Sequence, residues 1–247
     1  MKGSEAFFAS RSMQALEVLA FGPSTATQLA AELQVHPRTA RRLLNRMVHD
    51  GWVVRRDGPR PTYTPTMRIV ALAAQLAHRA PLVRHAAGVA RDLHERLGCP
   101  VHLAIPSYRS ALRLVHVAGS GDGVPALRDL APAHAIAAGK LLLAFRDPWR
   151  EVVLAAPLAS LTDRTLVDAG RLRAELDRTR DRGYAVEDEE FRAGARALAV
   201  PVRVNGEVVA ALAVSSERAS LAELLASGER ARLAAEELSA RLAAEQA

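Results

Sequence analysis

The sequence predicts an α+β protein of two domains, and three observations lead to this fold class. The 247 residues exceed one average domain, and the 49% that are apolar suffice for two cores. Apolar residues recur with helical spacing up to about residue 81, after which strand and helix patterns mix. Residues 1–79 hold eleven Lys or Arg and five Asp or Glu, whereas the rest of the chain holds 22 of each. This division is typical of a nucleic-acid-binding module joined to a neutral body, with a merely solvated basic face as the alternative.

Two helices are predicted before residue 35. The first has apolar residues at a period of 3.6 and ends at the turn "FGPS" (21–24). The second begins at Ser24 or Thr25, because Thr25 and Gln28 have the spacing of a capping box, and it buries apolar residues up to Leu33. The three residues "QVH" then separate it from a third helix.

The third helix begins at Pro37, stops before Gly51 and has two different faces. At 100° per residue the apolar and basic side chains separate, with Ala40, Leu43, Leu44 and Met47 on one side and Arg38, Arg41, Arg42 and Asn45 on the other. A short helix, a tight turn and a second helix with a cationic outer face predict a helix-turn-helix, whose second helix enters the DNA major groove.

A wing follows, because "WVVRR", "DGPRP" and "TYT" read as strand, turn and strand. Residues 1–64 are therefore predicted to form a winged helix-turn-helix, with a small helical domain bearing solvated arginines as the alternative. Arg38 and Arg42 lie where side chains reach base edges, Arg46 and the wing arginines are expected on phosphates, and Thr39 is a phosphate contact or an ordinary first-turn residue. The predicted DNA-binding residues are Arg38, Thr39, Arg41, Arg42, Arg46, Arg55, Arg56 and Arg60.

Residues 65–81 are predicted to be a linker helix that ends at Pro81. Its apolar stripe of Ile69, Leu72 and Leu76 either packs against a second copy or packs on its own domain. One winged helix reads only a few base pairs, so a homodimer or homotetramer on repeated half-sites is expected.

Residues 82–247 are predicted to form a sheet with flanking helices. A helix ending at "RLG" precedes two antiparallel strands, the loop "GSGDG" (119–123), an apolar helix (135–145) and a second helix (167–183). A β-hairpin turning at Asn205-Gly206 and one closing helix from about Leu221 to Ala243 complete the domain.

The sequence supplies no residues for catalysis, a metal or a cofactor. It contains no P-loop, no HExxH pair and no GxSxG elbow, and the acidic run 187–190 reads as a solvated turn. Cys99 is the single cysteine, and neither a signal peptide nor an apolar run of membrane-spanning length is present, so a cytoplasmic location is expected.

The chain resembles the IclR family of bacterial transcriptional regulators from residue 10 almost to its end. The resemblance rests on "TARRLL" (39–44) followed by "GWV", "AHAIAAGKLLLA" (133–144), "RDRGYAVEDEEFRAG" (180–194) and "ALAVPVRVNGEVVAALAVSS" (197–216). It implies a winged-helix DNA-binding domain, a linker helix and a GAF-like effector domain that binds small molecules, often organic or aromatic acids, in a dimer or tetramer.

The resemblance also implies an effector pocket. Its predicted lining is Ile136, Ala138, Gly139, Lys140, Glu187, Ala197, Ala213 and Ser215. Family members often carry Thr, Asp, Cys and Ser in place of Ile136, Glu187, Ala197 and Ala213, so a less polar pocket and an apolar or aromatic acid are expected. The acid group is placed at the helix start near Gly139, where backbone N–H groups favour an anion, and Lys140 either contacts the ligand or forms a structural ion pair.

The sequence therefore predicts a ligand-responsive transcription factor. Two alternatives remain open: a constitutive DNA-binding protein whose C-terminal domain is only an oligomerisation scaffold, and an enzyme with a DNA-binding appendage.

Overall fold

The computed structural model describes residues 2–77, 79–119 and 130–245. It divides into two compact units, Met1–Arg79 and Ala80–Ala247, and the division falls within residues 65–81, the predicted connection. Apart from Gly119, the loop "GSGDG" lies outside the described residues. None of the helices in the described ranges is long and apolar enough to cross a membrane.

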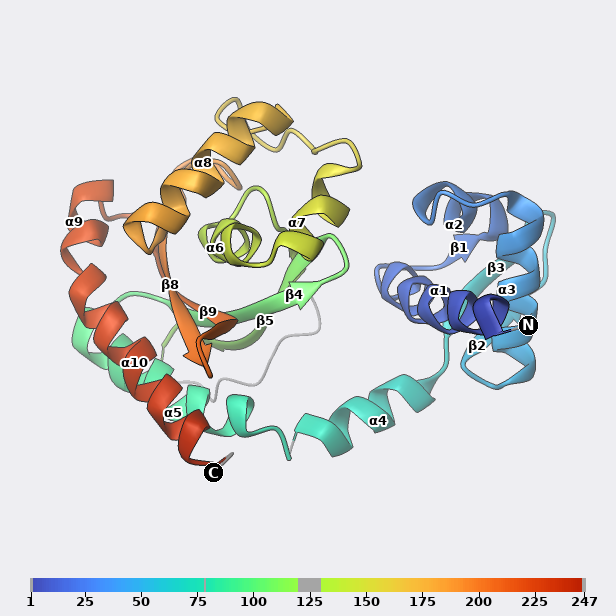
Figure 1. The fold of residues 1–247 in the computed structure, drawn as a ribbon, viewed down its shortest axis with the longest axis horizontal. Helices are drawn as coiled ribbons and strands as arrows, with labels where there is room; N and C mark the ends of the chain where they lie inside the picture. The colour runs from blue at the N-terminus through green and yellow to red at the C-terminus, as the bar shows by residue number, and fades with distance from the viewer. Residues whose placement is uncertain (1, 78, 120–129, 246–247) are drawn as a thin grey trace. The chain divides into compact units, whose positions relative to one another are not determined.

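The N-terminal unit is a winged helix-turn-helix, as predicted (Figure 1). Its elements are α1 (Lys2–Ala20), β1 (Ser24–Thr25), α2 (Ala26–Glu32), α3 (Pro37–His49), β2 (Val53–Arg56), β3 (Thr62–Pro65) and α4 (Met67–Ala77). The wing strands β2 and β3 pair antiparallel, and the two-residue β1, which the sequence analysis did not foresee, adds to the outer edge of β3.

Local signals in the sequence set the boundaries of α2 and α3. Thr25 caps α2 by accepting from the backbone N–H of Gln28 at 3.2 Å, and the Gln28 side chain accepts from the backbone N–H of Thr25 at 2.8 Å, which confirms the capping box. Pro37 occupies the first turn of α3, where no backbone bond is lost. The predicted core face of α3 is buried: Ala40, Leu43, Leu44 and Met47.

The C-terminal unit contains one six-stranded antiparallel sheet in the order β6-β5-β4-β9-β8-β7. Its strands are β4 (Val101–Ser107), β5 (Ser110–Val117), β6 (Leu130–Pro132), β7 (Ala185–Asp188), β8 (Arg196–Val204) and β9 (Glu207–Ser216). Its helices are α5 (Pro81–Leu97), α6 (Ala137–Phe145), α7 (Asp147–Leu154), α8 (Ala169–Arg182), α9 (Leu221–Ala226) and α10 (Gly228–Ala244). The predicted α+β class is therefore observed.

The two faces of this sheet carry different side chains because strand residues alternate between faces. One face is rich in Val and Leu and packs against α5 and α10. The other face is rich in alanine and packs against α6, with α7 and α8 beyond that helix (Figure 1). The alanine face carries Ala104, Ala185, Ala197, Ala199, Ala211 and Ala213.

Several predicted boundaries differ from the structure. The hairpin turn is confirmed, with φ of 52° at Asn205 and 83° at Gly206. Pro81 does not end the linker helix; α4 ends at Ala77, and Pro81 occupies the first turn of α5. The closing helix is two helices, α9 and α10, which meet at Ser227, the C-cap of α9. Strand β6 and helix α7 were not predicted.

Helix α6 approaches a neighbouring backbone closely at Gly139. A Cβ atom at this position would lie 2.2 Å from the carbonyl oxygen of Ala133, well inside van der Waals contact. Glycine is required here because the obstacle is backbone, which cannot rotate away as a side chain does.

We expect Gly139→Ala to destabilise the C-terminal unit by about 3 kcal/mol, because α6 must move away from residue 133. Urea unfolding followed by the fluorescence of Trp149, the single tryptophan after residue 79, measures this change. Gly88→Ala in α5 is the matched control, because nothing lies within 4 Å of its Cβ position. That substitution should raise stability by about 0.5–1 kcal/mol. Equal stability of the two variants would contradict the proposed role of Gly139.

Candidate functional site

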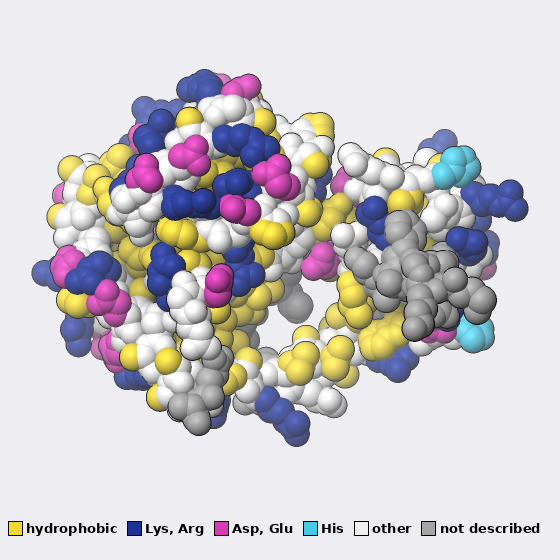
Figure 2. Space-filling model, viewed as in Figure 1, with side chains coloured by type: hydrophobic (Ala, Val, Ile, Leu, Met, Phe, Trp, Pro, Cys, Tyr) yellow, Lys and Arg dark blue, Asp and Glu magenta, His cyan; other side chains and the backbone are white. Residues whose placement is uncertain are grey.

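The basic surface of the N-terminal unit lies on α3 and the wing. Lys and Arg side chains project from the edge where α3 lies (Figure 2). The exposed arginines are Arg38, Arg41, Arg42 and Arg46 on α3, Arg55 and Arg56 on β2, and Arg60 in the turn that follows. Thr39 is half-buried in the first turn of α3, where its N–H donates to the carbonyl of His36 at 2.8 Å.

Helix α4 is attached at its start to the end of α3. The hydroxyl of Thr66 donates to the carbonyl of Gly51 at 3.0 Å, and Arg68 donates to the carbonyl of Asp50 at 2.9 Å. The Arg68 guanidinium also lies 4.2 Å from the ring centroid of Trp52, within cation–π range. These contacts join the linker helix, the end of the recognition helix and the first wing strand into one piece.

The apolar stripe of α4 does not pack on the described part of its own unit. Leu72 is 45% exposed and Leu76 is 59% exposed, while Ile69 is half-buried. Met67 and Val70 add to the exposed apolar surface of this helix, which Figure 2 shows as a run of hydrophobic side chains.

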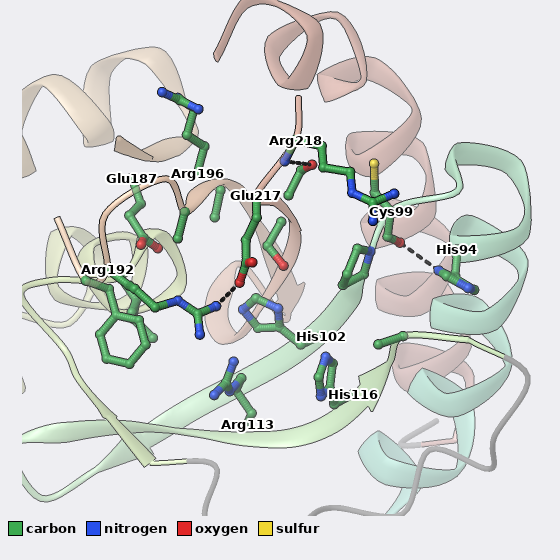
Figure 3. Close-up of a pocket in the computed structure, with 18 of the residues that line it drawn as sticks. His94, Cys99, His102, Arg113, His116, Glu187, Arg192, Arg196, Glu217 and Arg218 are labelled. Carbon is green, nitrogen blue, oxygen red and sulfur yellow. Dashed lines mark hydrogen bonds and ion pairs between the residues drawn. The ribbon is translucent and has the colours of Figure 1, made fainter. Parts of the chain in front are cut away.

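The C-terminal unit contains a cavity of about 580 Å³ on the α6 side of the sheet (Figure 3). Five strands contribute to it: β4, β5, β7, β8 and β9. The segment before α6 and the loop between β7 and β8 contribute as well. Its apolar lining includes Ile136, Phe191 and Ala197. Its polar lining includes an acidic part, Glu187, and a cationic part on the β4–β5 hairpin, together with the ion pair between Arg192 and Glu217.

Glu187 forms the acidic part. It lies on β7 opposite Ala197 and is only 5% exposed. Burial, and after it the charge of Glu190, raises the pKa of Glu187 to about 7, and Lys140 counteracts this in part. The backbone N–H of Ala137, the first residue of α6, donates to the Glu187 carboxylate and favours its ionised form. The protein therefore places its own carboxylate at the start of α6.

Lys140 forms a buried ion pair with Glu190, one of the two alternatives that the sequence leaves open. The side chain of Lys140 is 1% exposed and that of Glu190 is 11% exposed. Burial raises the pKa of the Glu190 carboxyl, and Lys140 opposes that shift. Residues 187–190 are not the solvated turn that was predicted, because two of their four carboxylates are buried.

The cationic part is a cluster on the β4–β5 hairpin, and we call His102, Arg113 and His116 the hairpin cluster. His102 pairs with His116 across the strands, their rings 6.3 Å apart, and Arg113 pairs with Ala104 two residues further on. Burial lowers the pKa of His102 to about 3, and the positive charge of Arg113 and His116 contributes, so the ring is neutral. Its buried Nδ1 has no hydrogen-bond partner within the part of the chain that the structure describes.

Sequence reasoning missed the hairpin cluster. The available signal was three basic side chains in the otherwise apolar strands "PVHLAIP" and "ALRLVHVA". The other arginines of the cavity are engaged or peripheral: Arg196 bonds Asp188 at 2.9 Å, Arg192 pairs with Glu217, and Arg218 is exposed at the rim. Within the described ranges, no group of three or more His, Cys, Asp or Glu could hold a metal ion.

The predicted effector residues divide into two groups. Ile136, Glu187, Ala197 and Ser215 line the cavity. Ala138, Gly139, Lys140 and Ala213 do not; they are buried where α6 meets the sheet or its flanking segments. Groups of the protein itself lie at the helix start where the sequence places the acid group: the Ala133 backbone faces Gly139, and the Glu187 carboxylate accepts from the N–H of Ala137. The placement of the acid group there stays a prediction.

A winged helix-turn-helix with a basic recognition helix, joined to a separate α+β unit, defines the class of DNA-binding transcriptional regulators. Within that class the chain belongs to the IclR family. Residues 9–57 match the IclR helix-turn-helix domain, and residues 74–240 match the C-terminal domain of the bacterial transcriptional regulator IclR. Members of this family are regulators and in general not enzymes.

Similar proteins agree with this assignment. The transcriptional regulator SauR of Cupriavidus necator is 30% identical over 239 residues, 92% of this chain and 94% of that one. The crystal structure of an IclR-type regulator from Silicibacter sp. TM1040 has the same fold, with a TM-score of 0.72 at 24% identity over 96% of each chain. An IclR homologue from Microbacterium hydrocarbonoxydans, solved in complex with 4-hydroxybenzoate, has a TM-score of 0.59 at 26% identity over 92% of this chain and 98% of that one.

We expect Lys140→Met to destabilise the C-terminal unit by about 3–5 kcal/mol, because it leaves the Glu190 carboxylate buried and unpaired. The double variant Lys140→Met/Glu190→Gln removes both charges and should recover most of this loss. Urea unfolding at pH 7.5, followed by Trp149 fluorescence, compares the two. A double variant as unstable as the single one would show that the loss comes from packing and not from the unpaired charge.

Proposed function

We propose that this regulator responds to a ligand: it binds an operator through α3 and the wing, and a small aromatic or apolar organic acid in the cavity of its C-terminal unit. The observation that carries the proposal is the cavity itself, which combines an apolar wall with a cationic cluster. Such a combination suits an acid with an apolar body. The homologue complexed with 4-hydroxybenzoate supports this ligand class.

For DNA, we propose that Arg38, Arg41 and Arg42 face the major groove and that Arg46 and the wing arginines meet phosphates. All of these arginines are exposed, and α3 places its other face in the core. Thr39 is assigned to a phosphate, because a hydroxyl in the first turn of a recognition helix lies close to the DNA backbone.

For assembly, we propose a homodimer or homotetramer in which α4 pairs with a second copy. The exposed apolar stripe on α4 supports this arrangement, since single-chain packing leaves Leu72 and Leu76 in water. Because α4 is attached to α3, the same contact sets the spacing between two recognition helices.

The rival function is constitutive DNA binding with a C-terminal scaffold. Fluorescence anisotropy separates the two functions. The intergenic DNA adjoining the gene is titrated with the protein, with and without each of a panel of aromatic and aliphatic acids. We expect at least one acid to change the DNA affinity. Identical binding curves throughout the panel would favour the scaffold, and turnover of a bound acid would favour an enzyme.

We expect Arg42→Ala to weaken operator binding by roughly 1–3 kcal/mol, because the side chain projects from the outer face of α3. Arg46→Ala should instead reduce the dependence of log K on log salt by about 0.9, the value for one lost phosphate contact. Arg171→Ala, an exposed arginine on α8, is the control. Unchanged affinity of the folded Arg38→Ala/Arg42→Ala protein would exclude α3 as the recognition helix.

We expect Leu72→Glu/Leu76→Glu to weaken self-association, because like charges would replace apolar contacts between paired α4 helices. Sedimentation velocity at micromolar concentration measures the assembly, and DNA footprinting measures the length of the protected site. Leu161→Glu, a substitution of another exposed leucine far from α4 in sequence, controls for surface charge. An unchanged sedimentation coefficient in the α4 variant would place the dimer contact elsewhere.

A further inference from the structure

The cavity is electrostatically polarised along the sheet. Figure 3 shows Glu187 on one side and the three side chains of the hairpin cluster on the other. Glu187 comes from β7, whereas the cluster comes from β4 and β5, and β8 and β9 lie between them. A ligand that spans the cavity from β7 to the hairpin therefore meets the Glu187 carboxylate at one end and the basic side chains of the hairpin cluster at the other.

From this polarity we infer that the cavity binds its ligand in one direction, with the acid group on the hairpin cluster and a hydrogen-bond donor, such as a hydroxyl, on Glu187. This inference rests on the proposed function, since it takes an organic acid as the ligand. It reverses the direction expected from the start of α6. The ligand class is thus a hydroxy-substituted acid whose two groups lie at opposite ends of an apolar body.

The hairpin cluster suits an anion for two separate reasons. Arg113 and His116 create a positive field, and that field is strong enough to help keep the adjacent His102 neutral. The buried Nδ1 of His102 has no hydrogen-bond partner among the described residues, so a ligand oxygen can complete its hydrogen bonding. Arginine with imidazole N–H groups is a common set of donors for a carboxylate.

The Glu187 end disfavours an anion for equally direct reasons. The Glu187 carboxylate already accepts a hydrogen bond from the N–H of Ala137, so this donor at the start of α6 is not available to the acid group of a ligand. A second carboxylate would face Glu187 at close range, with Lys140 already paired to Glu190. A hydroxyl can donate to the Glu187 carboxylate, and Ile136 and Phe191 next to it suit an aromatic ring.

The distance between the two ends fits a small aromatic body. Strands β7 and β4 are three strand spacings apart, so their backbones lie about 14 Å from each other along the sheet. Glu187 and Arg113 both reach into the cavity and shorten this gap. What remains suits one substituted aromatic ring, which lies between the two polar ends.

Four probes of one shape test the direction of binding by isothermal titration calorimetry. The probes are 4-hydroxybenzoate, 4-methoxybenzoate without the donor, 4-hydroxybenzamide without the charge, and terephthalate with a second charge in place of the hydroxyl. In the native protein we expect 4-hydroxybenzoate to bind most tightly, and terephthalate to bind roughly tenfold or more weakly because like charges repel.

Two variants assign the ends. Glu187→Gln removes the repelling charge, so terephthalate should gain about tenfold in affinity while 4-hydroxybenzoate loses affinity. A gain of binding cannot arise from misfolding. Arg113→Gln should weaken the binding of the three acids but leave that of the amide nearly unchanged. Arg171→Gln, an exposed arginine on α8 that does not line the cavity, is the control and should change the binding of none of the probes.

The outcomes separate this inference from the proposed function. Two results would overturn the direction while the acid-binding function stands. In one, the probes bind but terephthalate gains nothing from Glu187→Gln; in the other, Arg171→Gln reproduces the loss caused by Arg113→Gln. If none of the four probes binds at millimolar concentration to a protein that binds DNA, the aromatic ligand class falls, and the inferred direction falls with it.

The pH dependence gives an independent readout. The charged groups that face Glu187 are Lys140 from α6 and Glu190 from the turn after β7, and the Glu187 pKa is about 7. Protonation of Glu187 between pH 8 and pH 6 removes the repulsion, so the preference for 4-hydroxybenzoate over terephthalate should shrink across this range. Both acids place a carboxylate on the hairpin cluster, so changes at that end affect both affinities alike and cancel in their ratio. The ratio should be flat in Glu187→Gln; a pH-independent ratio in the native protein would contradict the role of Glu187.

Discussion

The contact between α6 and the alanine face of the sheet determines where the rest of the C-terminal unit can lie. Both partners present small side chains: alanines on the strands, and Ala137, Ala138 and Gly139 on the helix. Small side chains bury apolar surface only if the backbones come close. The helix also lies tightly against the segment that precedes it, where a Cβ atom at Gly139 would stand 2.2 Å from the Ala133 carbonyl oxygen. The approach of α6 fixes its first residues beside Glu187, and the cavity lies beyond them.

This tight apolar layer also explains why a few charges dominate the cavity. A charge among alanines has no water to solvate it, so it needs a partner or a shifted pKa. Lys140 has its partner in Glu190, whereas Glu187 is left with backbone donors and a pKa near 7. Acidic and cationic groups thus survive on opposite sides of one cavity because two intervening strands, β8 and β9, keep them apart.

The sequence predicts the parts of this molecule that short-range rules control. The capping box at Thr25, the two faces of α3 and the Asn205-Gly206 turn all follow from residues within a few positions of one another, and all are observed. The cavity depends on pairing between distant segments instead. Lys140 and Glu190 are fifty positions apart, and the hairpin cluster forms only when β4 and β5 pair with an irregular register between Leu103 and Ala104. No local pattern encodes either arrangement.

The errors in the predicted helix boundaries also arise because a local pattern leaves more than one outcome open. Pro81 stops one helix or starts another with equal ease, because proline lacks the N–H that a first turn does not use. The residues before Pro81 decide which of the two it does, and here α4 has already ended at Ala77, so Pro81 starts a helix. The start of α4, in contrast, is held by specific contacts. Thr66 and Arg68 donate to the carbonyls that follow α3, and Arg68 also lies against Trp52 before the wing. Turning α4 without α3 would break two hydrogen bonds and a cation–π contact together. The linker helix and the recognition helix therefore form one body, and in the proposed dimer a change in the pairing of α4 would change how α3 meets DNA.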